Sequence, residues 1–155
     1  MKFCINIEDE QNNVFALTLN EIKYLKIIFR FFEEEKAISL TTLSKILGIR
    51  PSSVLDTINS LINKGLIIKT RRKIELTEKG LRLMKFIIMK KRILELFFFH
   101  ILDLSAQLSR KEADKIDYLV SCKTIEKIVE KLEKRKINTK SCIHNKPTYI
   151  EEFFK

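Results

Sequence analysis

The feature that most constrains this 155-residue chain is a pair of short helical segments near its middle, separated by only a few residues. Ser39 can cap a helix that Gly48 ends, because a hydroxyl accepts from first-turn amides and glycine readily takes the left-handed conformation that terminates helices. Pro51 suits the first position of the next helix, where its missing N–H costs nothing. Gly65 ends this helix, whose apolar residues recur at helical spacing: Val54, Leu55, Ile58, Leu61 and Ile62. The pattern predicts two helices joined by a tight turn.

A longer helix is predicted ahead of this pair. Thr18 and Glu21 fit a capping box at its start, and apolar residues follow at helical spacing to Phe32. We expect it to end near residues 35–36. Further upstream, residues 3–7 alternate between apolar and polar, and residues 14–17 form a second short apolar run. This spacing predicts a β-hairpin over residues 1–18.

Two short β-type runs, 66–69 and 74–76, follow the helix pair, and the basic sequence 70–73 lies between them. Thr77 can cap a long helix that extends to about residue 102. Ser109 and Glu112 fit a second capping box for a helix to about residue 120, and Ser121 can cap a last long helix. The order predicts a mainly α fold in which residues 19–80 form a winged helix-turn-helix unit.

This order of elements points to DNA. The second helix of such a motif fits the major groove with its N-terminal residues near the base edges, and a basic hairpin lies along phosphates or enters the minor groove. The candidate DNA-binding residues are Arg50, Ser52, Ser53, Thr57, Lys69, Arg71, Arg72 and Lys73. The serines also suit ordinary helix N-terminal chemistry, and the cations also suit an ordinary charged turn. The role of Asp56 stays open, because its carboxylate repels phosphate but can accept from a cytosine amino group.

Composition narrows the function class. The formal charge is +10, from 30 basic and 20 acidic residues, which favours a polyanionic partner. The three cysteines are far apart and predict no disulfide framework, and no apolar run approaches the roughly 20 residues of a membrane span. We therefore expect a cytoplasmic, nucleoid-associated protein. With two histidines, no phosphate-cradling glycine loop and no nucleophile–base constellation, we expect no catalytic residues and no small-molecule substrate.

Several segments together carry a resemblance to a known family. Residues 49–54, 65–66, 76–77 and Gly80 resemble the iron- and manganese-dependent repressors of the diphtheria toxin repressor and manganese transport regulator family. Residues 90–98 resemble that family's lysine-histidine-arginine segment with a glutamate one turn later, and residues 142–147 resemble a segment near the end of its dimerisation domain. The resemblance covers about residues 20 to 147. It rests on the order of these segments along the chain rather than on any single motif.

The resemblance implies a helical dimerisation domain over residues 81–147, followed by a tail at 148–155. It implies a homodimer that reads a pseudo-palindromic DNA site whose half-sites lie about one helical turn or more apart. The candidates for the subunit seam are Phe97, Phe98, Ile101 and Leu102. These side chains also suit the core of a single chain.

The family is switched by a divalent metal, and its ligand positions are altered in this chain. They fall on Lys23, Lys91, Glu95, Arg110, Asp114, Asp117 and Tyr118, so every histidine is replaced. A protonated lysine has no lone pair for a metal. We hypothesise that Lys23 and Lys91 supply the positive charge themselves by pairing with the carboxylates, so that no cofactor is needed. Two alternatives are scattered surface charges and a residual oxygen-rich metal site at Glu95, Asp114 and Asp117.

Three functions fit the sequence. The first is a sequence-specific transcriptional regulator of the repressor type that binds DNA as a homodimer without metal activation. The second is a sequence-tolerant architectural DNA-binding protein, which the net charge permits. The third is a protein-interaction module that kept the fold and lost DNA binding.

Overall fold

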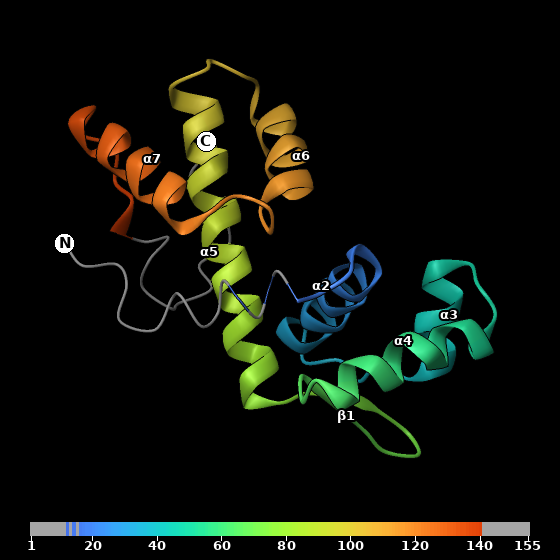
Figure 1. The fold of residues 1–155 in the computed structure, drawn as a ribbon. Coiled ribbons are helices and arrows are strands. Elements are labelled where there is room, and N and C mark those ends of the chain that lie inside the picture. Colours follow the sequence, from blue (N-terminus) through green and yellow to red (C-terminus); the bar gives the residue numbers. More distant parts are fainter. Residues whose placement is uncertain (1–11, 13, 15, 141–155) are drawn as a thin grey trace. The chain divides into compact units, whose positions relative to one another are not determined.

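The structure is a computed structural model that describes residues 12, 14 and 16–140 (Figure 1). The chain divides into two compact units, one formed by Ala16–Met84 and the other containing the chain from Lys85 onward. Helices predominate in both units, which confirms the predicted mainly α class. In the described part of the chain, no helix is both long and apolar enough to cross a bilayer.

The first unit is a winged helix, as predicted. Its elements in chain order are α2 (Leu19–Glu33), α3 (Leu40–Leu47), α4 (Pro51–Asn63), β1 (Ile67–Lys69), β2 (Ile74–Leu76) and the first turns of α5 (Glu78–His100). The strands pair antiparallel, with Ile67 opposite Leu76 and Lys69 opposite Ile74, and Ile38 forms an isolated bridge to Ile74. The core of this unit consists of fully buried apolar side chains, among them Leu25, Ile28, Leu43, Val54, Ile58, Leu61, Ile67 and Leu83.

Helix boundaries in this unit follow the capping chemistry. Thr18 and Glu21 form both hydrogen bonds of the predicted capping box at the start of α2. The Ser39 hydroxyl accepts from an amide in the first turn of α3, and Gly48 ends that helix at a φ of 67°. Pro51 occupies the first turn of α4, as expected.

The second unit contains the rest of α5 together with α6 (Ala106–Ile116) and α7 (Cys122–Lys134). Their apolar faces form one cluster: Ile93, Leu94, Leu96, Ala113, Ile125, Ile128, Val129 and Leu132. Phe97, Phe98 and Ile101 pack against this cluster and are partly buried, whereas Leu102 is 51% exposed. The ammonium of Lys90, a fully buried residue, donates to the Val120 carbonyl at 2.6 Å and holds the segment between α6 and α7.

One helix start was predicted wrongly. Helix α6 is capped by Ser105, whose hydroxyl accepts from the Leu108 amide, so the helix begins three residues before the predicted cap. Ser109 lies inside α6 and is fully buried beside Ala113, one turn further on. Only Ser109 has the glutamate of a capping box three residues on, because Leu108 follows Ser105 at that spacing, yet the burial of one helix face places Ser109 inside the helix. The helix also ends at Ile116 rather than near Val120.

Most of the predicted N-terminal hairpin lies outside the described residues, at positions 1–11, 13 and 15. Its second predicted strand, over residues 14–17, is not formed at the described positions. Val14 is helical and buried, and Ala16 lies in a turn that leads into the Thr18 cap. An apolar run of four residues does not distinguish a strand from one helical turn, which is why periodicity failed there.

Candidate nucleic-acid interface

The turn between α3 and α4 sets the direction of the second helix of the motif. The Ser44 side chain donates a 2.6 Å hydrogen bond to the Ile49 carbonyl, and the Ile49 amide donates to the Ser44 carbonyl at 3.2 Å. Ser44 itself is buried, so water does not compete strongly for this bond. Together with the left-handed Gly48, these bonds fix the turn that delivers Arg50 and Pro51 to the surface.

The N-terminus of α4 is exposed and has no side-chain cap. Residues 50–53 are all exposed, and no side chain accepts a hydrogen bond at the cap position. This differs from α2, α3, α6 and α7, which are each capped by a serine or threonine hydroxyl. First-turn amides without a cap, aligned with the helix dipole, suit a phosphate oxygen. Of the other predicted residues of α4, Thr57 is half-buried, and the Asp56 side chain is exposed.

Among the described residues, three cations of the wing have no partner. The turn between the strands is closed by the Thr70 amide, which donates to the Lys73 carbonyl at 2.9 Å. Lys69, Arg71 and Arg72 are exposed, and within residues 16–140 they form no ion pair or hydrogen bond through their side chains. The fourth predicted cation differs, because the Lys73 ammonium pairs with Glu75 at 2.7 Å. The predicted wing cations are therefore not equivalent.

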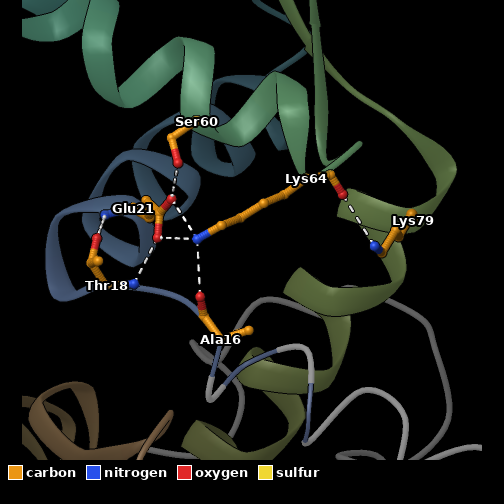
Figure 2. Close-up of polar contacts among 6 residues, drawn as sticks. All are labelled: Ala16, Thr18, Glu21, Ser60, Lys64 and Lys79. Atoms are coloured by element: carbon orange, nitrogen blue, oxygen red, sulfur yellow. Dashed lines mark hydrogen bonds and ion pairs between the residues drawn. The ribbon is translucent and has the colours of Figure 1, made fainter.

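A buried carboxylate joins the first helix of the unit to the end of α4 (Figure 2). Glu21 accepts from the Lys64 ammonium at 2.7 and 2.8 Å and from the Ser60 hydroxyl at 2.7 Å, and it also caps the Thr18 amide at 2.7 Å. Burial alone raises the pKa of Glu21, but the hydrogen bonds from Lys64, Thr18 and Ser60 outweigh it and lower the pKa to about 2. We call these four residues the Glu21 clamp.

The amino-acid sequence predicted only the local half of the Glu21 clamp. The capping box predicted the contact between Thr18 and Glu21, which are three residues apart. Ser60 and Lys64 lie 39 and 43 residues further along the chain and share one face of α4, at i and i+4. No local pattern pairs them with Glu21, although a polar face near the end of a packed helix was a weak signal.

The base of the wing is fixed by close backbone contacts. Thr77 donates through its hydroxyl to the Gly65 carbonyl at 2.7 Å, and its amide donates to the Leu66 carbonyl at 3.0 Å. A Cβ atom added to Gly80 would lie 2.0 Å from the Leu66 carbonyl oxygen, so only glycine permits this approach. The Lys79 ammonium also donates to the Lys64 carbonyl at 3.1 Å (Figure 2). These contacts anchor the wing to the start of α5.

A charged cluster lies between α5 and α6 in the second unit. The Lys91 ammonium pairs with Asp114 at 2.8 Å, and both side chains are partly exposed. Glu95 is 3% exposed, and its Oε1 has no hydrogen-bond partner within the described residues. Burial raises the pKa of Glu95, against the lowering effect of Lys91, Arg110 and Arg92. Asp117, the residue that follows the last turn of α6, is fully buried.

Comparison with known proteins gives consistent matches over both units. The chain is 31% identical over 115 residues to an uncharacterised HTH-type transcriptional regulator of Methanocaldococcus jannaschii, which covers 73% of this chain and 92% of that protein. Residues 77–149 match the iron dependent repressor metal binding and dimerisation domain, and residues 15–85 match the RuvB C-terminal winged helix domain. The chain belongs to the family of iron- and manganese-dependent winged-helix repressors.

Similar solved structures agree with the assignment. A hypothetical protein of Sulfolobus solfataricus is 28% identical, with a TM-score of 0.65 over 76% of this chain and 91% of that one. The manganese regulator SloR and the T. acidophilum protein IdeR are each 26% identical over 76% of this chain, with TM-scores of 0.62 and 0.61. The chain spans 55% of the length of each of these two longer repressors.

The residues at the family's metal-ligand positions are lysine, arginine, carboxylates and tyrosine in this chain, with no histidine among them. The Lys91 ammonium pairs with Asp114 at 2.8 Å, and burial raises the pKa of the neighbouring Glu95. Across residues 12, 14 and 16–140, no three histidine, cysteine, aspartate or glutamate side chains group as ligands. Lys23 is exposed on α2 in the first unit, so its predicted pairing across the two units stays a prediction.

Proposed function

We propose that this member of the repressor family is a DNA-binding transcriptional regulator that reads a pseudo-palindromic site as a homodimer and needs no metal. It acts by binding rather than by catalysis, at the nucleoid of the cytoplasm. The observation that carries the proposal is that one unit holds both an uncapped α4 N-terminus and the wing cations Lys69, Arg71 and Arg72, which have no partner among the described residues. Amides positioned for phosphate and free cations beside a groove-sized helix are the parts that DNA recognition requires.

The DNA-binding residues are tested by comparing two variants of the wing. Arg71→Gln with Arg72→Gln removes two unpartnered cations, and Lys73→Gln removes one that is already paired with Glu75. Binding to a DNA duplex is followed by fluorescence anisotropy over a range of salt concentrations. In the double variant, the slope of log K against log salt concentration should fall in magnitude by about two per bound chain, or about four for the proposed homodimer. In the Lys73 variant it should fall by distinctly less than one per bound chain. Unchanged affinity in the double variant would favour the protein-interaction module.

Sequence specificity is tested separately. We expect selection from a random duplex library to yield one enriched motif with two half-sites about one helical turn or more apart. Bulk competitor DNA should then displace the protein from this motif only at a large excess. Equal competition by bulk DNA and the selected duplex would favour the architectural DNA-binding protein instead.

Homodimerisation rests on the end of α5. Leu102 is 51% exposed there, and Phe97, Phe98 and Ile101 are only partly buried against the core of their own unit. Sedimentation velocity should give a dimer, and Leu102→Glu should shift the equilibrium towards the monomer without loss of helix content. Leu119→Glu, an equally apolar and exposed position at 57%, is the matched control and should stay dimeric. A monomeric parent protein contradicts this part of the proposal.

Metal independence rests on the 2.8 Å ion pair between Lys91 and Asp114. Calorimetric titration with Mn²⁺, Fe²⁺, Co²⁺ and Zn²⁺ should show no stoichiometric binding that raises DNA affinity. Lys91→His restores the residue type of the metal-dependent relatives, and it is the variant in which metal binding should begin to appear. Tight binding of one metal per parent chain, with tighter DNA binding, would contradict the proposal and support the residual oxygen-rich site.

A further inference from the structure

The unit that follows the winged helix carries as much excess positive charge as the winged helix itself. Residues 16–84 contain thirteen lysines and arginines against seven acidic residues, and residues 85–140 contain fourteen against eight. DNA contacts through the wing and α4 would account only for the excess positive charge of residues 16–84. The second excess is concentrated at the end of the unit, where residues 122–140 hold seven lysines and arginines against three glutamates.

Helix α7 sorts these charges onto one face. Its buried residues, Ile125, Ile128, Val129 and Leu132, fix which side faces the core. The lysines lie on the opposite side at positions i, i+4, i+8 and i+11, which places them within one narrow stripe: Lys123, Lys127, Lys131 and Lys134. At 1.5 Å per residue the stripe is about 16 Å long. We call these four residues the α7 lysine stripe.

Most of the stripe is free to bind an anion. Lys123, Lys131 and Lys134 are exposed, and within the described part of the chain they form no ion pair or hydrogen bond through their side chains. Lys127 is 77% exposed and pairs with Glu130 at 2.9 Å. Lys136, just after the helix, is also exposed and without a partner in this part of the chain.

We propose that the α7 lysine stripe is a second DNA-contacting surface, which binds the phosphate backbone without reading its sequence. The proposal rests on the proposed function, because the wing and α4 bring DNA to the same protein and so raise its effective concentration near α7. A row of ammonium groups about 6 Å apart is complementary to the closely spaced phosphates of a DNA strand. Specific and non-specific contacts would then come from different units of one chain.

The test measures the salt dependence of DNA binding by the full chain. The probe is a mixed-sequence duplex of about 30 base pairs, followed by fluorescence anisotropy. Lys123→Gln, Lys131→Gln and Lys134→Gln are combined in one variant, which should lower the magnitude of the log–log salt slope by about two to three per bound chain. A control variant removes charges from other exposed positions of the same unit and should change the slope by less than one per bound chain: Lys85→Gln and Lys111→Gln, whose side chains form no ion pair within the described residues.

A second variant guards against a folding defect. Lys136 has a φ of 59°, a backbone conformation that favours glycine, so Lys136→Gly removes a neighbouring cation without strain. It should lower the slope by up to about one while leaving the helix content unchanged. Equal slopes in the parent, the stripe variant and Lys136→Gly overturn the proposal.

The outcomes separate this proposal from the proposed function. If only the Arg71 and Arg72 double variant lowers the slope, the wing binds DNA and the stripe does not. If only the stripe variant does so, the stripe proposal stands and the wing-based function fails. If the parent chain does not bind the duplex, both fail. Loss of binding to phosphatidylserine vesicles in the stripe variant, with an unchanged DNA slope, would assign the stripe to a membrane surface and overturn the proposal.

Discussion

The Glu21 clamp gives the sharpest test of how the winged helix is held together. Replacing Glu21 by glutamine keeps the shape but removes the charge that Lys64 neutralises at 2.7 Å. The pKa of Glu21 falls from 4.5 to about 2 on folding. At about 1.4 kcal/mol for each pKa unit, this corresponds to about 3 kcal/mol of stabilisation. Because Lys64 is one-third exposed, water can rehydrate its freed ammonium, so we expect a loss of about 2–3 kcal/mol.

The pH dependence follows from the direction of the pKa change. A carboxyl group whose pKa is lower in the folded state stabilises the fold above its unfolded pKa, near 4.5, and loses that contribution as the pH falls towards 2. The difference in unfolding free energy between the parent and Glu21→Gln should therefore be full at pH 7 and shrink between about pH 5 and pH 2. Urea denaturation followed by circular dichroism at 222 nm measures it, because the chain has no tryptophan and is mostly helical in its described part.

Two results would refute this reasoning. A Glu21→Gln variant as stable as the parent at pH 7 would show that the clamp contributes little. A loss that stays constant down to pH 3 would show that the charge of Glu21 is not the cause. Glu34→Gln is the matched control, because Glu34 pairs with Lys36 at 2.8 Å on the exposed surface and should give no measurable change.

Three further predictions concern single side chains. Gly80→Ala should destabilise the fold by about 1–3 kcal/mol in urea denaturation, because the new Cβ would lie 2.0 Å from the Leu66 carbonyl oxygen; wild-type stability would show that the helix shifts freely. Ser44→Ala removes the 2.6 Å bond to the Ile49 carbonyl and should cost about 1 kcal/mol and also weaken DNA binding, and unchanged DNA affinity would separate the turn from recognition. Burial lowers the pKa of Lys90 to about 8, so parent stability should rise with pH from about 8 to 10.5 relative to Lys90→Met; parallel profiles would contradict this assignment.

The sequence predicted the helices and the wing because those signals are local. Ser39, Gly48 and Pro51 set the boundaries of α3 and α4 through backbone chemistry that does not depend on distant residues. The same locality explains the failure at Ser109, where a capping box with Glu112 suggested a helix start and the burial of one face of α6 placed this serine inside the helix instead.

The sequence predicted which residues of the candidate interface carry positive charge, but not which of them form ion pairs. Lys73 differs from Lys69, Arg71 and Arg72 because Glu75 follows two residues later in β2, and the extended backbone places both side chains on one face of the strand. The α7 lysine stripe was present in the sequence as charges at helical spacing. The tertiary structure shows that these lysines are exposed, because Ile125 and Leu132 pack in the core and the lysines lie on the opposite face of the helix.

The amino-acid sequence by itself determined the two short helices around Gly48 and Pro51, because caps, left-handed glycines and helical spacing act over a few residues. It also determined the family, through an ordered series of short segments. Only the tertiary structure decided how the end of α4 is held, since Glu21 meets Ser60 and Lys64 across about 40 residues of chain. Contacts over that separation depend on which helix faces pack together, and buried apolar area rather than local chemistry makes that choice.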